Sequence, residues 1–215
     1  MNIKWLGHSC FLIISEGGIR IITDPYTVGE GINYSPIKES ADIVVVSHGH
    51  GDHSNVAAIR GKPEGVKGSG IKTTGGIQFR GIATYHDTSQ GKQRGPNTIF
   101  CFNVDGIEIC HLGDLGHVLS PEQVAELGVI DILLIPVGGF YTIDATEASQ
   151  VCDQLKPRII IPMHFKTSKC AYPIAEVDDF LKGKTNVKRM EVSEVEFEQG
   201  KLSATAEIIL LQPAL

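Results

Sequence analysis

Four side chains of metal-ligand type lie within six residues of this chain. They are three imidazoles and one carboxylate, from His48, His50, Asp52 and His53, and glycine separates the first three of them. Imidazole nitrogen and carboxylate oxygen bind zinc, and also iron, nickel or manganese. We expect the two glycines to adopt φ values that other residues avoid, so that the side chains can converge. The density of the cluster favours a metal site over the alternative, a polar loop with scattered histidines.

Further residues of the same chemical type come directly after apolar segments that predict strands. Residues 43–46 are Ile-Val-Val-Val, which predicts a short strand buried on both faces, and the cluster follows it. Three later residues also follow apolar segments: His86, Asp114 and His164. Ligands at strand ends are typical of layered α/β enzymes, so we expect these side chains to meet the cluster in one site.

The rest of the chain is predicted to alternate short strands with a few helices. Apolar patterns predict strands over 3–6, 11–14, 19–22, 77–85, 98–104, 107–112, 132–135, 158–161, 187–190 and 202–210. Loops are predicted where glycine, proline and polar residues gather, over 26–40, 61–70 and 88–97. There is no P-loop, Gly-x-Gly-x-x-Gly or EF-hand spacing, which excludes the common nucleotide and calcium motifs.

Four helices are predicted, two of them from capping signals. Ser120 and Asp144 are each followed three residues later by Gln or Glu, as in a capping box. Two further helices are predicted over 173–181 and 56–59. The second of these would start near Asp52, so capping it is the alternative role for that carboxylate.

Composition indicates a soluble globular protein. A chain of 215 residues suits one domain, 1–215, and is long enough to bury a core without disulfides. Apolar residues make up 42% and charged residues 20%, which is ordinary for such a protein. The formal net charge is −6 and there is no basic run, so a nucleic-acid or anionic-membrane partner is disfavoured. The sequence leaves open whether copies of the chain form a homo-oligomer.

Cysteine spacing and the chain ends favour a cytoplasmic protein. The five cysteines are widely spaced and include no Cys-x-x-Cys pair, which favours reduced thiols over a disulfide scaffold or a structural zinc knuckle. The first residues contain no long apolar segment of the kind that a signal peptide has. The apolar run 208–211 is too short to span a bilayer. A cytoplasmic enzyme is therefore expected.

Five separated elements of the chain resemble the signature of the metallo-β-lactamase superfamily. They are Asp24 at a strand end, the His-x-His-x-Asp-His cluster, the lone His86, Asp114 in His-Leu-Gly-Asp, and His164 in Pro-Met-His-Phe. Four short stretches resemble more specifically a branch of metal-dependent hydrolases related to ascorbate-6-phosphate lactonase: 5–8, 85–87, 113–116 and 136–139.

The resemblance implies an α/β fold, a four-layer αββα sandwich with a two-metal site at the edge of its two sheets. Carried onto this sequence, three residues would hold one metal: His48, His50 and His86. Three others would hold the second metal: Asp52, His53 and His164. Asp114 would bridge the two ions, and Asp24 corresponds to a residue that hydrogen-bonds the histidine loop and orients its ligands. The expected cofactor is two divalent ions, zinc first, with manganese, iron or nickel as alternatives.

Two metal ions close together would lower the pKa of a shared water, so that hydroxide is present near neutral pH. We therefore predict a hydrolase that uses the activated hydroxide on an ester, lactone or phosphodiester bond of a small molecule. Asp52 is expected to orient the hydroxide as well as to bind metal. His8, after the first strand, and His117, three residues after Asp114, are candidate catalytic residues on the substrate side, with ordinary turn histidines as the alternative.

Two other functions are left open by the sequence. One is a redox enzyme of the same fold that uses two irons for oxygen or sulfur-compound chemistry, and the other is a non-catalytic metal-binding relative. The chain lacks the extra helical domain of glyoxalase II and the inserted domain of the nucleic-acid-processing branch, so neither specificity is expected. Four basic residues could meet a phosphate-bearing substrate or be ordinary solvated loop residues: Lys92, Arg94, Lys166 and Lys169.

Overall fold

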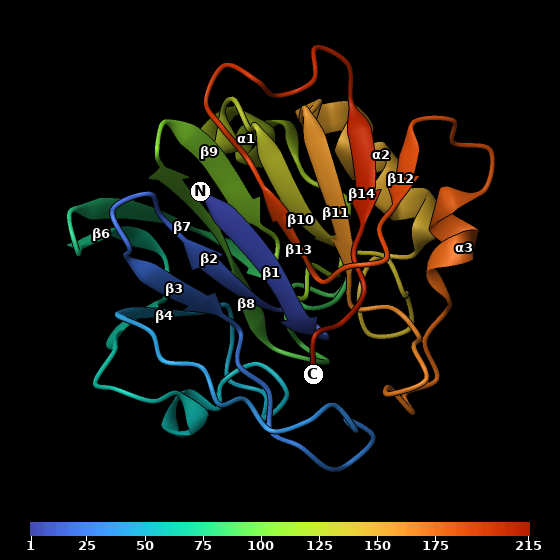
Figure 1. The fold of residues 1–215 in the computed structure, drawn as a ribbon. Helices are drawn as coiled ribbons and strands as arrows, with labels where there is room; N and C mark the ends of the chain where they lie inside the picture. Colours follow the sequence, from blue (N-terminus) through green and yellow to red (C-terminus); the bar gives the residue numbers. More distant parts are fainter.

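Two β-sheets face each other at the centre of the molecule (Figure 1). The computed structural model describes all 215 residues. The first sheet contains β1 (Asn2–Gly7), β2 (Cys10–Ile14), β3 (Arg20–Thr23), β4 (Ile43–Val46), β5 (Glu64–Lys67) and β13 (Glu194–Glu196). The second contains β6 (Gly70–Thr74), β7 (Ile77–Tyr85), β8 (Pro96–Val104), β9 (Ile107–His111), β10 (Ile132–Pro136), β11 (Ile159–Met163), β12 (Val187–Arg189) and β14 (Glu207–Leu210). Their orders are β13-β1-β2-β3-β4-β5 and β12-β14-β11-β10-β9-β8-β7-β6.

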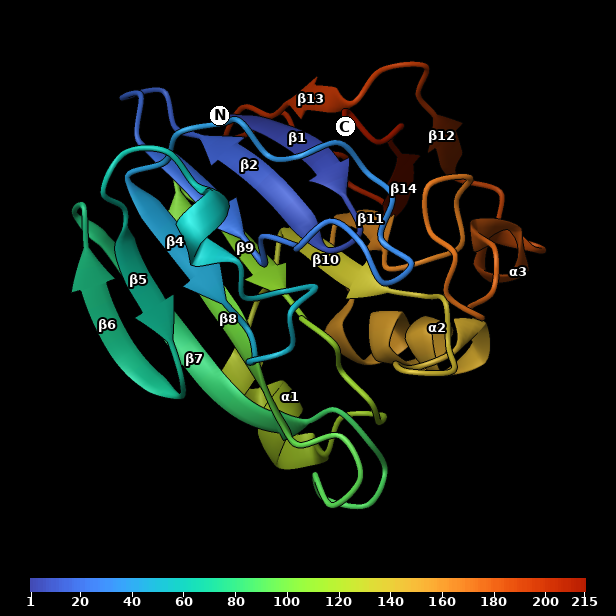
Figure 2. The ribbon, with the colours of Figure 1, turned by 90° about the horizontal axis from the view of Figure 1, so that it is seen from below.

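Helices cover the outer side of the eight-stranded sheet (Figure 2). They are α1 (Pro121–Leu127), α2 (Ala145–Leu155) and α3 (Val177–Leu181), with α3 beside α2. Both predicted capping boxes are confirmed, because the side chains of Ser120 and Asp144 accept backbone N–H groups of the first turn and the third helical residue of each helix bonds back. None of the three α-helices has the length and apolar run that a bilayer crossing requires.

A long irregular segment covers the outer side of the six-stranded sheet. One buried cluster joins strand residues such as Leu12 and Ile22 to Tyr26, Tyr34 and Ile37 of the segment between β3 and β4. The single-turn 3₁₀-helix η1 (Val56–Ala58) lies beyond β4 in the chain. The layer order that the resemblance implied is therefore present, but on this side no α-helix contributes to the outer layer.

Alternate residues of the first-sheet strands face opposite layers. Ile21 and Ile43 belong to the core cluster between the sheets, whereas Ile22 and Val44 belong to the cluster under the irregular segment. Side chains of a strand point alternately to its two faces, so a strand buried on both faces has no polar positions. The prediction of a strand of this kind over 43–46 is confirmed.

The strands that precede the ligand-type residues run in one direction within each sheet. In the six-stranded sheet, β1 and β3 are both antiparallel to β2, and β4 is parallel to β3. In the eight-stranded sheet, β7 and β9 are both antiparallel to β8, and β10 and β11 continue parallel to β9. Because the carboxyl ends of parallel strands meet at one edge, the residues that follow these strands emerge together.

Three edge strands were not expected from the sequence. The sequence predicts an exposed connection over 61–70, but the structure has β5 and the start of β6 there. Each lies at the edge of its sheet, and so does β13, which reads Glu-Val-Glu. An edge strand buries few side chains and often carries charged ones, so it lacks the apolar pattern on which strand prediction depends.

Two predicted helices are shorter than expected. The helix predicted over 173–181 begins only at Val177, after an extended stretch. The helix predicted over 56–59 is the single turn η1, preceded by Asn55, and no side chain caps it. The alternative role of Asp52 as a helix cap is therefore wrong, and its carboxylate is available to the histidine cluster.

Ile21 and Ile22 give a test of the packing on the two faces of the first sheet. Both side chains are 0% exposed, so Ile21→Ala and Ile22→Ala should each lower the free energy of unfolding by about 2–5 kcal/mol, because each leaves a cavity. Urea denaturation of the metal-free protein measures the change. Ile71→Ala is the control, since that side chain is 66% exposed. A cost for Ile22→Ala as small as that of the control would mean that the irregular segment does not cover the sheet.

Candidate metal centre

His48, His50 and His86 form one group of imidazoles at the edge of the two sheets. His48 Nε2 and His50 Nδ1 are 3.1 Å apart. The ring centre of His86 lies 4.9 Å from that of His48 and 5.1 Å from that of His50. Two ligands of a tetrahedral zinc ion, with bonds of about 2.0–2.1 Å, are about 3.3 Å apart. The spacing of the two neighbouring nitrogens therefore fits a shared ion.

Asp52, His53 and His164 form a second group, together with His8. The four residues offer donor atoms that all lie within 4.8 Å of one another. Asp52 Oδ2 is 3.6 Å from His53 Nε2 and 3.3 Å from His8 Nε2. The two groups correspond to the two sets of ligands that the sequence resemblance implied, with His8 added to the second.

The carboxylate of Asp114 lies between the two groups. Its Oδ2 is 3.0 Å from His86 Nε2 in the first group. The same oxygen is 3.2 Å from His53 Nε2 and 3.4 Å from His164 Nε2 in the second group. The side chain of Asp114 is 2% exposed, and its Oδ1 has no hydrogen-bond partner. One buried carboxylate oxygen therefore contacts both groups, as a bridging ligand would.

Asp24 orients a ligand in each group. Its Oδ2 lies 3.0 Å from His53 Nδ1, and because a carboxylate only accepts, His53 carries its proton on Nδ1 and presents Nε2 to the cluster. Ser47 donates to Asp24 from both its backbone N–H and its hydroxyl. The Ser47 hydroxyl therefore accepts from His48 Nδ1, 2.9 Å away, which leaves His48 Nε2 without a proton. This is the supporting role that the resemblance implied for Asp24.

Three strand ends have a backbone conformation that residues other than glycine rarely adopt. The φ angle is 52° at His8, 38° at Asp24 and 50° at His164. Such conformations persist where the surroundings hold them, often at functional sites. Gly49 and Gly51, by contrast, do not have positive φ, and a Cβ on either would meet nothing within 4 Å. The reason that the sequence suggested for these glycines is wrong, and their effect is to leave the outer side of the histidine loop open.

The turn that follows β9 packs closely against the first residue after β4. Gly113 has a φ of 55°, and an added Cβ would lie 2.4 Å from Asn97 Oδ1 and 2.5 Å from Ser47 Cβ. Asn97 Oδ1 also accepts the backbone N–H of Asp114 at 3.0 Å. Ser47 and Asn97 therefore position residues of the cluster, and neither role was predicted from the sequence. Ser47 could have been noticed because it directly precedes His48, whereas no sequence signal marks Asn97.

Two histidines near the cluster form hydrogen bonds to backbone groups through both ring nitrogens. His111 Nε2 bonds Ser9 O at 2.9 Å, and its Nδ1 accepts a backbone N–H, so it links the two sheets. His117 Nδ1 bonds Val118 O at 2.9 Å, and its Nε2 accepts from Tyr85 N at 3.3 Å. The structure therefore does not bring His117 into the cluster, and the ordinary turn histidine describes it better than the substrate-side role that the sequence suggested.

Burial and mutual proximity set the protonation of the cluster. Burial lowers the pKa of His48 to about 3 and that of His8 to about 4. Burial alone would raise the pKa of the Asp114 carboxyl, but the charges of His164 and His53 outweigh it and hold that pKa well below its usual range. Burial would lower the pKa of His53, but Asp114 and Asp24 outweigh it and raise that pKa well above its usual value. Neutral imidazole and ionised carboxylate are the forms that bind metal ions, so a bound cation would take the place of the His53 proton.

Several buried polar atoms of the cluster have no hydrogen-bond partner. They are Nδ1 and Nε2 of His8, Nε2 of His53, Nδ1 of His86, Oδ1 of Asp114 and Nδ1 of His164. Because nearly all buried polar atoms in proteins are paired, unpaired donors and acceptors that share one site need an explanation. A set of imidazole nitrogens and carboxylate oxygens fits zinc, and also manganese, iron or nickel.

The basic residues near the cluster differ in what they contact. Lys166 Nζ donates to Tyr172 O at 2.6 Å, and Lys169 Nζ donates to Leu215 O at 2.7 Å, so both lysines are held by backbone carbonyls. The guanidinium of Arg94 lies 4.3 Å from the ring centre of Tyr141 and forms no ion pair. Arg94 is therefore a cation without an acidic partner.

Asp87 fixes the loop that carries Arg94. Its Oδ1 accepts the backbone N–H groups of Ser89 and Gly91, and its Oδ2 accepts those of Gln93 and Arg94, at 2.7 to 3.0 Å. The loop is tied to the metal centre because His86 N donates to the carbonyl of residue 95 at 3.1 Å. The predicted polar loop therefore has a defined conformation next to the cluster.

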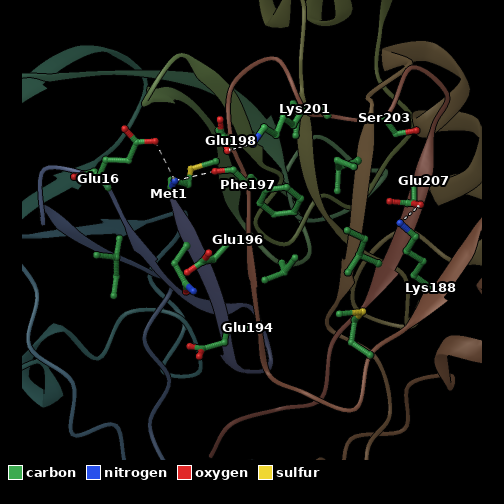
Figure 3. A pocket seen from close by; sticks show the side chains of 18 residues that line it. Met1, Glu16, Lys188, Glu194, Glu196, Phe197, Glu198, Lys201, Ser203 and Glu207 are labelled. Atoms are coloured by element: carbon green, nitrogen blue, oxygen red, sulfur yellow. Dashed lines mark hydrogen bonds and ion pairs between the residues drawn. The ribbon is translucent and has the colours of Figure 1, made fainter.

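A cavity of about 820 Å³ lies at the other end of the strands, where β1 and β11 begin (Figure 3). Glutamates of β13 and β14 line it, and ion pairs such as Lys188–Glu207 at 2.8 Å and Lys201–Glu198 at 2.6 Å cross its wall. None of its lining residues belongs to either imidazole group. This cavity is therefore separate from the candidate metal centre.

Comparison with known proteins places the chain in a family. Residues 2–164 match the family model for the β-lactamase superfamily domain. A UPF0173 metal-dependent hydrolase of Archaeoglobus fulgidus is 29% identical, over 94% of this chain and 97% of its own length. One from Thermococcus onnurineus is 31% identical, over 78% of this chain and 85% of its own length.

The crystal structure of a similar protein supports the same family assignment. A Thermotoga maritima protein, described as a candidate Zn-dependent hydrolase of the metallo-β-lactamase superfamily, has a TM-score of 0.80 and 36% sequence identity, over 98% of both chains. The predicted α/β fold class is thereby confirmed. The chain belongs to the metallo-β-lactamase superfamily and, within it, to the UPF0173 metal-dependent hydrolases.

Proposed function

We propose that this metal-dependent hydrolase holds two divalent ions, zinc first, and cleaves an ester, lactone or phosphodiester bond of a small molecule. The observation that carries the proposal is the position of Asp114 Oδ2, which contacts an imidazole of one donor group at 3.0 Å and two of the other at 3.2 and 3.4 Å. The first ion would be held by His48, His50 and His86. The second would be held by Asp52, His53 and His164, and Asp114 would bridge the two.

The surroundings of His53, His48 and Asp52 favour the protonation state that each needs in this proposal. Bound divalent ions polarise a substrate oxygen and lower the pKa of water, which supplies the nucleophile. Asp24 keeps the proton of His53 on Nδ1, and through Ser47 it does the same for His48, so both rings offer a lone pair. Burial raises the pKa of Asp52, but neighbouring His8 and His53 outweigh it, so Asp52 stays a carboxylate that can accept a hydrogen bond from the attacking water.

The substrate would approach along the exposed side of the histidine loop. Gly49, His50 and Gly51 are exposed, whereas His53 and His164 are buried. A neighbouring wall is aromatic, because the rings of Phe140, Tyr141, Tyr172 and His8 follow one another at centre distances of 4.7, 5.6 and 5.9 Å. The wall and the net charge of −6 favour a small molecule over nucleic acid or a membrane surface.

Arg94 at this wall favours a substrate with an anionic group. Its guanidinium stacks on Tyr141 at 4.3 Å and has no acidic partner. A guanidinium held in this way can form charge-assisted hydrogen bonds to a carboxylate or a phosphate. Among the proposed substrates, a phosphodiester carries such a group, and so does an ester or lactone with a carboxylate or phosphate substituent.

Removing one metal ligand tests the proposed hydrolase. Protein loaded with Zn²⁺ should hold two ions per chain and hydrolyse at least one of a set of aryl esters, lactones and aryl phosphodiesters. His48→Ala should lower kcat/KM by about 100-fold or more, because the metal contributes several kcal/mol to the transition state. Lys92→Ala is the control, since that residue is exposed and its side chain has no partner.

Two results would contradict this proposal. Equal activity of His48→Ala and the unchanged chain would remove the site from the reaction. Iron bound tightly after purification without added metal, together with a visible absorption band, would favour the redox alternative instead.

Arg94→Gln tests the preference for an anion. With two aryl esters that differ only by a carboxylate on the acyl chain, KM for the charged ester should rise by about tenfold, because a hydrogen bond to a charged group is lost. KM for the neutral ester should not change, and Lys92→Gln should change neither value. An equal rise for both esters would mean that Arg94 supports the loop and does not bind the anion.

A further inference from the structure

His8 has no assigned partner although it lies inside the metal centre. It follows β1, its side chain is 0% exposed, and its Nε2 is 3.3 Å from Asp52 Oδ2. Its ring centre lies 4.2 Å from that of His164 and 5.1 Å from that of His53. The ligand set of the proposed function does not use it. A buried imidazole among three metal-ligand residues therefore needs a role of its own.

Neither nitrogen of the His8 ring has a hydrogen-bond partner. The contact with Asp52 is close, but it does not have the geometry of a hydrogen bond, so positioning Asp52 does not account for the ring. Buried side-chain nitrogens are nearly always paired. A bond to a cation shared with Asp52, His53 and His164 would satisfy Nε2, because the donor atoms of all four residues lie within 4.8 Å of one another.

The backbone holds the His8 ring at this place. The carbonyl of His8 accepts hydrogen bonds from Trp5 Nε1 at 2.9 Å and from the backbone N–H of His164 at 3.3 Å. Residues from both sheets therefore hold His8 in place. The preceding Gly7 packs against Tyr34, because an added Cβ would lie 2.6 Å from that ring. With a φ of 52°, His8 keeps a conformation that is unfavourable for a side chain. These contacts direct the ring toward the second group rather than toward solvent.

We propose that His8 Nε2 is a fourth protein ligand of the ion held by Asp52, His53 and His164. The proposal rests on the two-ion site of the proposed function and refines it. The second ion would have four protein donors in addition to Asp114, whereas the first would have three. The two ions would then differ in affinity. The second would stay bound, and the first, next to the exposed His50, would exchange and offer open positions to the substrate.

His8→Gly is the variant that tests this proposal. Glycine adopts a φ of 52° without strain, so the variant should fold, and unfolding of the metal-free protein checks this. Wild-type protein, His8→Gly and His50→Ala are loaded with Co²⁺ and titrated with a chelator. The number of ions, their dissociation constants and the cobalt absorption spectrum are measured. These readouts do not depend on activity.

The expected result is specific to one ion. Wild-type protein should bind two Co²⁺ with unequal affinity, and His8→Gly should lose at least about tenfold in affinity for the tighter ion only, since a weaker perturbation, loss of an outer partner, already costs 10–100-fold. His50→Ala should weaken the other ion instead. Added imidazole should restore the cobalt spectrum of His8→Gly, because it can occupy the vacated ligand position.

Three outcomes would overturn the proposal, and they can be told apart. Unchanged affinities and spectrum in His8→Gly would show that His8 is not a ligand, while the proposed function would stand. Weaker binding without any effect of imidazole would show that His8 only positions Asp52. Wild-type protein that binds no Co²⁺ would overturn both this proposal and the proposed function.

Discussion

The buried carboxylate of Asp114 is the group on which the rest of the structure depends. Its Oδ2 lies within 3.4 Å of imidazole nitrogens of His53, His86 and His164, which come from three separate parts of the chain. A carboxylate that is 2% exposed has lost its water, so it must be compensated by positive charge or hydrogen bonds. In our proposal two cations provide the charge, and the surrounding imidazoles stay neutral as ligands.

The fold brings these groups together through strand direction and a few close contacts. Strands of both sheets end at one edge, and every ligand-type residue lies in the turn or loop after one of six of them. Gly113 allows the turn before Asp114 to approach Ser47, and Asn97 holds the same turn through its side chain. Asp24 then sets the tautomers of two histidines in different groups. A small error in any of these contacts would separate the two donor groups.

The sequence was sufficient for features that depend on local pattern. The strand before the histidine loop, the capping boxes and the order of the ligand-type residues are local, and the structure has them. Ser47 and Asn97 were missed because their roles depend on which strands lie side by side, which no motif encodes. The reason given for the glycines failed because the strained φ values occur instead at His8 and His164. For His117 the sequence left two roles open, because closeness in sequence to Asp114 does not fix the direction of a ring, and in the structure both ring nitrogens bond backbone groups.

A crystal structure of Zn²⁺-loaded protein, with anomalous scattering recorded at the zinc edge, tests the central claim most directly. The account predicts two anomalous peaks, one on each side of Asp114 Oδ2. One would lie among the donor nitrogens of His48, His50 and His86, and the other beside His53 and His164. Peaks elsewhere, or no peak within about 2–2.5 Å of the Asp114 carboxylate, would contradict it.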